Sequence, residues 1–561
     1  MTYRGADALV ETLSAAGIRQ LFTLSGNHVM PVFDATVGTQ VKLLHTRHEA
    51  ATVHMADAWA RLTGEVGIAL VTGGPGHANA ISALYTARMS DSPVVLLSGH
   101  APLGQLGRGA FQEMQQAAMA APVTKASWTC LGADEVASDL AKAMSIARSG
   151  RPGPVHLSLP SDALEARVDA PGRRGEREAG VGAGGGAGSG DGLIAAVSAG
   201  NRGGELTQDE ADAIVARLRK ARRPMILAGP GSLQRNGCNR LAELADACDA
   251  PAVGMQSPRG VNDPALGAFA QMLAQADCIL LLGKRADFTL KFGTAPTISA
   301  GCELLQLEPE AIEIERARQL SGGRPAVQRQ VDADTATEAL LGAARRLPAR
   351  RGGWRTEVDA ATSYRPAAWD QARAGDGKRL HPVQACRSLQ PLLDSHPDSV
   401  LICDGGEIGQ WAQACLRAPN LIVNGPAGAI GVGVPFGLAA RLARPDAPVV
   451  AVMGDGSVGF HIAEYDTALR HGLPFVGVVG NDARWNAEYQ IQLADYGAER
   501  AIGCELRPAR YDAVVAALGG HGELVEDVAS LAGAAARAHD SALPACVNIM
   551  IEGVAAPVVR R

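Results

Sequence analysis

A glycine-flanked aspartate and a downstream asparagine carry the strongest chemical signal in this sequence. The apolar run 448–453 leads directly into Gly454-Asp455-Gly456. Asn481 lies 26 positions after Asp455 and directly follows a second apolar run, 475–480. We expect the two runs to be neighbouring strands, so that both side chains reach one edge of a sheet. A carboxylate, an amide oxygen and a nearby backbone carbonyl suit a hard cation such as Mg2+ that also holds phosphate groups. Gly-Asp-Gly turns are common, so the motif alone leaves a purely structural role open.

A second candidate is Glu49, in the segment RHEAA over residues 47–51. It stands where a predicted strand turns into an alanine-rich helix. An acid in the first turn of a helix is favoured by the helix dipole, which is the structural explanation. The chemical alternative is a buried acid that exchanges a proton with a ring nitrogen of a cofactor.

A third candidate is the segment GAIGVG over residues 428–433, which precedes a predicted helix. Its small residues permit close approach of a ligand, and Ile430 is the bulky side chain at that turn. Ordinary packing of a helix on a strand is the alternative explanation.

The elements that must position these residues alternate between helix and strand along most of the chain, which is typical of parallel sheets. We predict an α/β fold of three doubly wound parallel-sheet domains, over residues 1–165, 207–345 and 381–561. The glycine-rich stretch 166–206 and the Arg/Gly/Ala-rich stretch 346–380 are predicted linkers, because neither has the composition to form a core.

Local patterns assign several elements within these domains. Thr207 and Glu210 have the spacing of a capping box at a helix start. The predicted helices are 6–16, 49–62 and 79–89, and the predicted strands are 20–24, 66–71, 93–98, 224–228, 278–282 and 303–307.

Composition excludes several classes of protein. The chain has 561 residues and a net charge of −6 with no basic stripe, which argues against a nucleic-acid partner. The long uncharged stretches 66–87 and 425–440 contain glycine and proline, so we expect strands, loops and buried helix starts rather than membrane spans. The ten cysteines include no Cys-x-x-Cys pair, and residues 1–13 do not form a signal peptide, so we expect free thiols in the cytoplasm.

Taken together, these motifs resemble a known family. RHEAATVHMADAWAR, VTGGPGHANAI, GAFQEM, GAIGVGVP and GDG…N occur in the order found in thiamine-diphosphate-dependent enzymes of the acetolactate synthase type. The resemblance covers nearly the whole chain outside 166–206. It implies a pyrimidine-binding domain, a middle domain and a diphosphate-binding domain, in that order.

The resemblance also implies roles for individual residues. Glu49 would activate the aminopyrimidine ring, Ile430 would be the wedge that bends the cofactor, and the Gly428 carbonyl would accept from its amino group. Mg2+ would be bound by Asp455, Asn481 and the carbonyl of Ala483. The implied cofactor-binding set is Glu49, Gly428, Ile430, Gly454, Asp455, Gly456, Ser457, Asn481 and Ala483.

The substrate side is assigned by the same resemblance. The expected catalytic residues besides Glu49 are Asn27, His28 and Gln112, with His28 also compatible with a surface loop. Phe111, Trp485 and Glu488 are candidates for lining the substrate pocket, although the sequence around Trp485 departs from the better-known family patterns.

The substrate class itself is divided between branches of the family. The segment 425–433 is nearer to acetolactate synthases, which act on 2-oxo acids, and we take that activity as the leading hypothesis. The segments 279–293 and 547–552 look more like 2-hydroxyacyl-CoA lyases or oxalyl-CoA decarboxylases.

Two other functions stay open at this point. A catalytically silent paralogue is disfavoured by the intact Glu49, and a nicotinamide dehydrogenase by the lack of Gly-x-Gly-x-x-Gly after a predicted strand.

A nucleotide ligand and a partner subunit are two further expectations. The Gly229-Pro230-Gly231 turn could approach a nucleotide such as FAD or ADP. In the family, the equivalent of Glu49 faces a cofactor bound mainly by the partner subunit, so we expect a homodimer or tetramer with active sites at the subunit interface.

Overall fold

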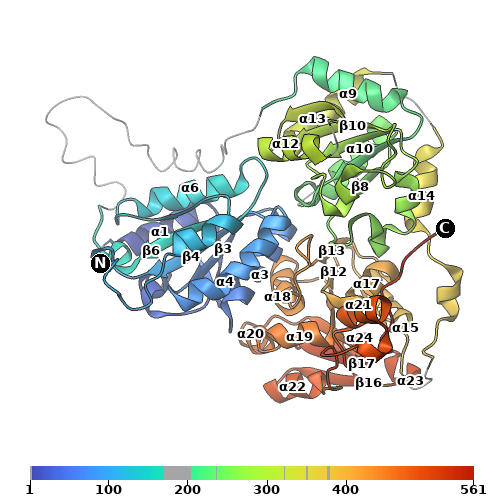
Figure 1. Cartoon of the computed structure of the whole chain (residues 1–561). Coiled ribbons are helices and arrows are strands. Elements are labelled where there is room, and N and C mark those ends of the chain that lie inside the picture. The colour runs from blue at the N-terminus through green and yellow to red at the C-terminus, as the bar shows by residue number, and fades with distance from the viewer. Residues whose placement is uncertain (1–2, 170–203, 235–236, 321–322, 349–351, 376–378) are drawn as a thin grey trace. The chain divides into compact units, whose positions relative to one another are not determined.

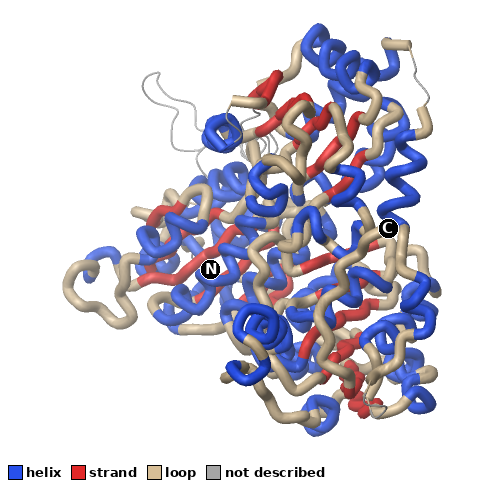
Figure 2. The backbone as a smooth tube through the Cα atoms, turned by 45° about the vertical axis from the view of Figure 1, so that its right-hand side comes forward, coloured by secondary structure: helices blue, strands red, loops and turns tan. Residues whose placement is uncertain are grey.

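The computed structural model describes residues 3–169, 204–234, 237–320, 323–348, 352–375 and 379–561 (Figure 1). The chain divides into two compact units, Met1–Arg202 and Gly203–Arg561. The first unit holds one parallel sheet and the second holds two, and helices flank the strands of each sheet (Figure 2). Most of the predicted linker 166–206 lies outside the described residues.

The sheet of the first unit has six parallel strands in the order β2-β1-β3-β4-β6-β5. Its centre is fully buried, because β3 and β4 have helices on both faces. The strands are β1 (Gln20–Thr23), β2 (Lys42–His45), β3 (Gly67–Val71), β4 (Val94–His100), β5 (Ser127–Thr129) and β6 (Val155–Pro160).

Two helix pairs cover this sheet, as Figure 1 shows. α1 and α6 pack together over one core, while α3 packs against α4 and β3. The helices are α1 (Gly5–Ala15), α2 (Met30–Ala35), α3 (Glu49–Thr63), α4 (Pro75–Met89), α5 (Gln116–Ala120), α6 (Val136–Arg148) and α7 (Ser161–Glu165), with the short 3-10 helix η1 (Asn27–Val29). α4 begins four residues before its predicted start, because Pro75 suits the first turn of a helix.

The middle sheet has five parallel strands in the order β11-β10-β9-β7-β8. Alternate residues of its strands point to opposite faces of the sheet and belong to two separate cores. One core lies under α9, α10 and α13, and the other lies under α11 and α14. The strands are β7 (Pro224–Ala228), β8 (Ala252–Gly254), β9 (Cys278–Leu282), β10 (Glu303–Glu308) and β11 (Pro325–Gln330). The helices are α9 (Gln208–Lys220), α10 (Gly237–Cys248), α11 (Phe269–Leu273), α12 (Ala311–Leu320), α13 (Ala333–Arg346) and α14 (Trp354–Ser363), with 3-10 helices η5 (Gly260–Asn262) and η7 (Phe288–Gly293).

Two details of this domain bear on the sequence predictions. The capping box at α9 is confirmed, since Thr207 Oγ1 accepts from the Glu210 amide and Glu210 Oε2 accepts from the Thr207 amide. The predicted linker 346–380 contains α14, whose Trp354 and Val358 are buried against the middle sheet. These apolar residues at helical spacing are the signal that a composition-based assignment overlooks.

The third sheet has six parallel strands in the order β13-β12-β14-β15-β17-β16. β14 and β15 pair directly, which confirms that the two apolar runs before Asp455 and Asn481 are neighbouring strands. The strands are β12 (Val400–Cys403), β13 (Asn420–Val423), β14 (Val449–Gly454), β15 (Val476–Asn481), β16 (His521–Val525) and β17 (Ala545–Met550).

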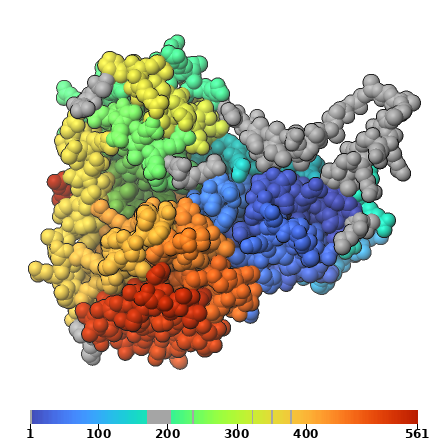
Figure 3. All heavy atoms as spheres, turned by 180° about the vertical axis from the view of Figure 1, so that it is seen from behind, coloured from blue at the N-terminus to red at the C-terminus, as the bar shows by residue number. Residues whose placement is uncertain are grey.

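The helices of this domain complete the second unit. α17 and α24 pack on one face of the sheet, and α18 packs on β12 and β14. Seen as spheres, the middle and C-terminal domains of the second unit form a continuous body (Figure 3). The helices are α15 (Pro382–Arg387), α16 (Gln390–Asp394), α17 (Gly406–Cys415), α18 (Gly433–Ala443), α19 (Asp455–His461), α20 (Glu464–Arg470), α21 (Asn486–Tyr496), α22 (Tyr511–Leu518), α23 (Val528–Leu531) and α24 (Ala534–Asp540).

Candidate functional site

A cleft opens at the carboxyl ends of β12, β14 and β15 in the second unit. Three segments line it, 406–408, 454–457 and 484–488, together with Ile430, Gly480 and Asp482. The predicted residues Ile430, Gly454, Asp455, Gly456, Ser457, Trp485 and Glu488 all contribute to this lining. In open parallel sheets this edge is where ligands bind.

Asp455 is the first residue of α19 and directly follows β14. Only 2% of it is exposed, and its Oδ2 has no hydrogen-bond partner among the described residues. Burial raises the pKa of Asp455 to about 6. A buried carboxylate oxygen without a partner costs free energy, and a bound cation would remove that cost.

The residue beside Asp455 in the cleft is Asp482, which the sequence analysis did not single out. Asp482 is buried, lines the cleft and directly follows β15. Burial and then the charge of Asp455 raise the pKa of Asp482 to about 7. Two carboxylates that disfavour each other's ionised form are a suitable donor set for a divalent cation.

Asn481 has a different environment from the predicted one. Its side chain is fully buried and donates to the Ala509 carbonyl at 2.9 Å and to Asn548 Oδ1 at 3.2 Å. Its Oδ1 accepts from the Ala483 amide at 3.2 Å. The structure therefore engages Asn481 within the protein and places Asp482, one residue later, in the cleft.

The carbonyl of Ala483 is also engaged, since it accepts from the Leu506 amide at 2.7 Å. Ala483 has a left-handed φ of 58°, which turns the chain from β15 toward α21. It is absent from the cleft lining, whereas the next residue, Arg484, contributes to it. Metal binding by Asn481 and Ala483 stays a prediction that this geometry does not favour.

The turn 428–433 is held by buried polar groups that the sequence analysis missed. The carboxylate of Asp404, at the end of β12, accepts from the amides of Gly431 at 3.2 Å and Gly433 at 2.8 Å. Asn424 Nδ2 donates to the Ala429 carbonyl at 2.7 Å. These bonds fix the backbone on both sides of the predicted wedge.

Ile430 itself projects toward the loop after β12. A Cβ on Gly405 would lie 2.1 Å from Ile430 Cγ2, so glycine is required there. Gly428 has a φ of +66° and is exposed, which leaves its backbone accessible to a ligand.

The far wall of the cleft is aromatic. Trp485 lies on Gly456, where a Cβ would come within 2.5 Å of the indole ring. Trp485 also meets Phe460 edge to face, with ring centroids 6.4 Å apart. Glu488 is exposed on α21 and faces the same opening.

These residues fit thiamine diphosphate and Mg2+. The orphaned Oδ2 of Asp455 and the adjacent Asp482 would hold the cation. The exposed Gly428 leaves backbone accessible to a flat, charged ligand. Ile430 would contact its central part.

In the first unit, Glu49 is the first residue of α3 and is buried. His48 caps the helix, since its Nδ1 accepts from the Ala50 amide. Glu49 Oε2 accepts from Asn79 Nδ2 at 3.0 Å. A Cβ on Gly76 would lie 3.3 Å from Glu49 Oε1, so the helix start of α4 crowds the carboxylate.

His28 lies close to the same part of the first unit. It is buried, with Nδ1 at 3.2 Å from Thr72 Oγ1. Gly76 also contacts Thr72, since its Cβ would lie 2.8 Å from Thr72 Cγ2, so Thr72 links the surroundings of His28 and Glu49. Burial lowers the pKa of His28, which favours the neutral imidazole. Asn27, by contrast, is exposed at the start of η1.

Phe111 and Gln112 approach His28 from another loop. The Phe111 ring stacks on His28 with centroids 6.1 Å apart, although 68% of Phe111 is exposed. Gln112 has a left-handed φ of 57° and touches Gly74, where a Cβ would lie 2.8 Å from the Gln112 Cβ. The first unit thus brings His28 together with Phe111 and Gln112, which lie far from it in sequence.

Gln116 is a further residue that the sequence analysis missed. Its Oε1 accepts from the Gly74 amide at 2.9 Å, and its Nε2 donates to the Gly99 carbonyl at 3.1 Å. It therefore ties the loop after β3, where Gly74 contacts Gln112, to the end of β4, where Gly99 contacts His28.

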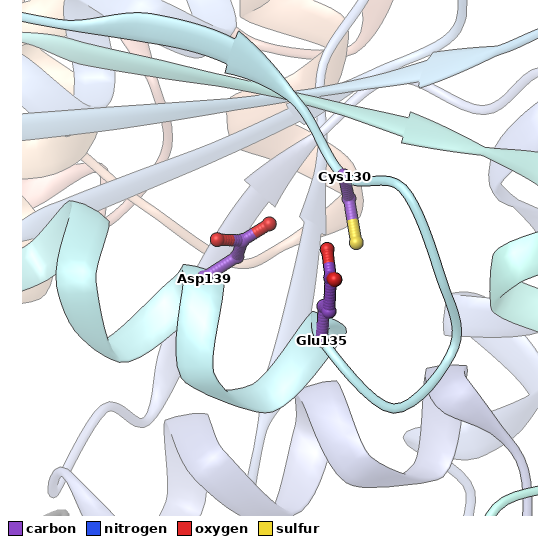
Figure 4. Close-up of side chains that lie close together, drawn as sticks. All are labelled: Cys130, Glu135 and Asp139. Atoms are coloured by element: carbon purple, nitrogen blue, oxygen red, sulfur yellow. The ribbon is translucent and has the colours of Figure 1, made fainter.

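A separate cluster of potential metal ligands lies at the end of β5. The side chains of Cys130, Glu135 and Asp139 point toward one another (Figure 4). The Cys130 thiol donates to the Gly132 carbonyl, and burial raises its pKa to about 12. Because metals bind the thiolate, this environment does not favour a metal.

Two further expectations can be compared with the structure. Gly229 is explained by packing, since a Cβ there would lie 2.2 Å from the Gly283 carbonyl oxygen, so the structure adds no support for FAD or ADP. Among the described helices, none has the length and apolar character needed to cross a membrane.

Comparison with known proteins gives a consistent result across the chain. Residues 3–119 match the N-terminal TPP binding domain of thiamine pyrophosphate enzymes, residues 211–340 the central domain and residues 404–549 the C-terminal TPP binding domain. An acetolactate synthase large subunit from Mycobacterium tuberculosis is 31% identical over 98% of this chain and 96% of its own length.

A second group of relatives carries a different name. The 2-hydroxyacyl-CoA lyase 2 of Homo sapiens is 30% identical over 93% of this chain and 85% of its own length, and that of Danio rerio is 28% identical over 93% and 86%. With three matching domain models and full-length relatives of both names, the chain belongs to the thiamine pyrophosphate enzymes.

Proposed function

We propose that this protein uses thiamine diphosphate and Mg2+ to decarboxylate a 2-oxo acid and to join the remaining fragment to a second carbonyl compound. The observation that carries the proposal is the cleft in which Asp455 and Asp482 lie beside the turn that bears Ile430. The similarity to an acetolactate synthase large subunit supports the choice of substrate. Thiamine diphosphate would supply an electron sink for the negative charge that loss of CO2 leaves on the carbonyl carbon of the 2-oxo acid.

The chain's own residues would divide the remaining work. Asp455 and Asp482 would hold the cation and, through it, the diphosphate. Glu49, buried and held by Asn79, would exchange a proton with the aminopyrimidine ring. His28, whose pKa is lowered by burial, would be neutral at pH 7 and able to accept a proton from the substrate.

The metal assignment is tested by Asp455→Ala. We expect the variant to lose Mg2+-dependent retention of thiamine diphosphate, because it removes an anionic ligand next to the diphosphate. A purified Asp455→Ala protein that holds the cofactor as tightly as the parent would show that the Mg2+ site is elsewhere.

We further propose a homodimer, or a tetramer built from such dimers. In it, Glu49 of one copy would contact the cofactor that is bound in the cleft of another copy. The sharpest test mixes two inactive variants, Glu49→Gln and Asp455→Ala. In a mixed dimer one of the two sites has both wild-type residues, so random mixing should restore about a quarter of the wild-type activity. No recovery after refolded or co-expressed mixing would place both residues of a site in one chain.

A second candidate function is cleavage or formation of a 2-hydroxyacyl-CoA, as in a 2-hydroxyacyl-CoA lyase or oxalyl-CoA decarboxylase. It is favoured by the relatives named 2-hydroxyacyl-CoA lyase 2. Product analysis with pyruvate alone, and then with formyl-CoA plus an aldehyde, separates the two functions. Activity on the CoA thioester with none on any 2-oxo acid would reverse their order.

Two remaining expectations belong with this proposal. A catalytically silent paralogue stays the least favoured alternative, since Glu49 and the cleft carboxylates are all present. The ten cysteines are free thiols, which suits the reducing cytoplasm as the place where the enzyme acts.

A further inference from the structure

The middle domain contributes a cation that pairs with a carboxylate in the wall of the cleft. Arg259 lies in the loop between β8 and η5, and its Nη2 is 3.2 Å from Glu407 Oε2. Glu407 is in the first turn of α17 and lines the same cleft as Asp455 and Ile430. The ion pair thus connects the middle domain to the candidate site.

The loop that carries Arg259 is firmly held. Gly260 has a φ of +54°, and a Cβ there would lie 2.0 Å from the Thr289 carbonyl oxygen, so the loop packs directly on η7. The Gly260 amide donates to the Ser257 carbonyl, and the Arg259 amide donates to Ser257 Oγ. Arg259 is therefore presented from a fixed backbone, as a recognition residue requires.

The same loop reaches the turn that bears the predicted wedge. Pro258 Cβ lies 3.7 Å from the position of a Cβ on Gly428. The residue before Arg259 therefore lies beside Gly428, which the resemblance places against the reacting part of the cofactor.

The two partners of the ion pair differ in their access to solvent. The Glu407 side chain is 7% exposed, whereas 45% of the Arg259 side chain is exposed. A guanidinium has five N–H donors, and the bond to Glu407 uses one nitrogen. Donors therefore remain for a second anion, and Glu407 fixes the direction of the planar group.

The charge of the cleft lining favours a nearby cation for an anionic substrate. Glu407 and Glu488 both line the cleft and would repel a carboxylate. Arg484, which does line the cleft, lies over the Tyr489 ring at 4.3 Å, on the α21 side.

We propose that Arg259 is a specificity-determining residue that binds the carboxylate of the 2-oxo acid, with Glu407 as its positioning residue. This inference rests on the proposed function. A phosphate of a CoA thioester would offer the same anionic chemistry, so the experiment must distinguish the two sources.

The test uses the full-length protein loaded with thiamine diphosphate and Mg2+. Oxamate, an unreactive analogue of pyruvate, is titrated calorimetrically into wild type, Arg259→Met, Arg259→Lys and the surface control Arg240→Met. We expect Arg259→Met to weaken oxamate binding roughly 10- to 100-fold, the usual effect of losing a charge-assisted hydrogen bond. Arg259→Lys should be intermediate, and Arg240→Met should match wild type.

Kinetics and a double variant test the two roles separately. Arg259→Met should raise KM for the 2-oxo acid with little change in kcat, and should leave KM for a neutral aldehyde acceptor unchanged. Glu407→Gln should weaken oxamate binding less than Arg259→Met does. Combining the two should be no worse than Arg259→Met alone, because Glu407 acts through Arg259.

Three results would overturn the inference. The first is that Arg259→Met binds oxamate as tightly as the wild type does. If Arg259→Met does not fold, the same result in both Arg259→Lys and Arg259→Gln would count instead. Another is a loss of binding of free CoA, rather than oxamate, in these variants, which would assign Arg259 to a phosphate. The third is that the wild-type protein neither binds nor turns over any 2-oxo acid, in which case the proposed function itself is wrong. If instead the wild type turns over a 2-oxo acid and Arg259→Met does so equally well, only the role of Arg259 is wrong.

Discussion

Asp455 and Asp482 directly follow two paired strands and line one cleft, where burial and then the charge of Asp455 raise the pKa of Asp482 to about 7. Two such carboxylates repel each other when both are ionised, and each is costly to bury. A divalent cation between them would reverse both effects, which is why we regard this pair as the centre of the site.

The first prediction separates Asp482 from Asn481. Asp482→Ala should weaken Mg2+-dependent binding of thiamine diphosphate strongly, while Asp482→Asn, which keeps an oxygen donor, should retain part of it. The measurement is a Mg2+ titration followed by cofactor binding in calorimetry.

Asn481→Ala is the matched comparison. It should chiefly lower the thermal unfolding temperature, because it removes the donor to the buried Asn548 Oδ1 and one of two donors to the Ala509 carbonyl. Equal loss of Mg2+ affinity in both alanine variants, with no loss of stability in Asn481→Ala, would return the ligand role to Asn481.

The second prediction concerns Glu49. Glu49→Gln keeps the size of the side chain and its bond from Asn79 but removes the exchangeable proton. Cofactor binding should persist, while turnover falls roughly 10²- to 10⁴-fold, the range for general acid–base groups.

The exposed residue Glu135 provides a control for that substitution, since Glu135→Gln should leave turnover unchanged. If Glu49→Gln retained full turnover, the helix-dipole explanation of this residue would be sufficient.

Much of the architecture could be predicted from local sequence. The buried runs 224–228 and 278–282 coincide with β7 and β9, because short apolar segments between polar boundaries are typical of central parallel strands. α14 was not predicted, because its apolar residues are surrounded by Arg, Gly and Ala in a stretch with the composition of a linker.

The site shows where sequence reasoning reaches its limit. Side chains alternate between the two faces of a strand. Two consecutive residues at the end of β15 can therefore lie on opposite sides, one in the core and one in the cleft. Asn481 ends the strand facing Asn548 on β17, and Asp482 faces the cleft. The Arg259–Glu407 pair joins residues 148 positions apart, so no local pattern could indicate it.

The third prediction concerns the packing behind His28 and Gln112. Gln116→Leu should lower the free energy of unfolding by about 1–3 kcal/mol, since it removes the acceptor of the buried Gly74 amide and a donor to the Gly99 carbonyl. Turnover should fall as well, because Gly74 contacts Gln112 and Gly99 contacts His28. Chemical denaturation measures the first effect, and Gln115→Leu, at an exposed neighbour, should show neither.

The last prediction follows from two buried histidines of the first unit. His77 and His156 are fully buried with ring centroids 4.6 Å apart, and neither Nε2 has a hydrogen-bond partner among the described residues. Burial lowers the pKa of His77 to about 4 and that of His156 well below its usual range. In the unfolded chain both would take up a proton near pH 6.5.

The sign of the effect follows from this difference. Between pH 6.5 and 4 the unfolded chain binds more protons than the folded one, so stability is full above pH 6.5 and is lost as the pH falls. His77 accounts for up to about 3 kcal/mol of this loss, and His156 acts in the same direction. Thermal unfolding at pH 7.5, 6 and 5 should show a steep decline in wild type and a shallower one in His77→Gln. The same substitution at the partly exposed His539 should leave the slope unchanged, and an equal slope in His77→Gln would mean that other groups control the acid sensitivity.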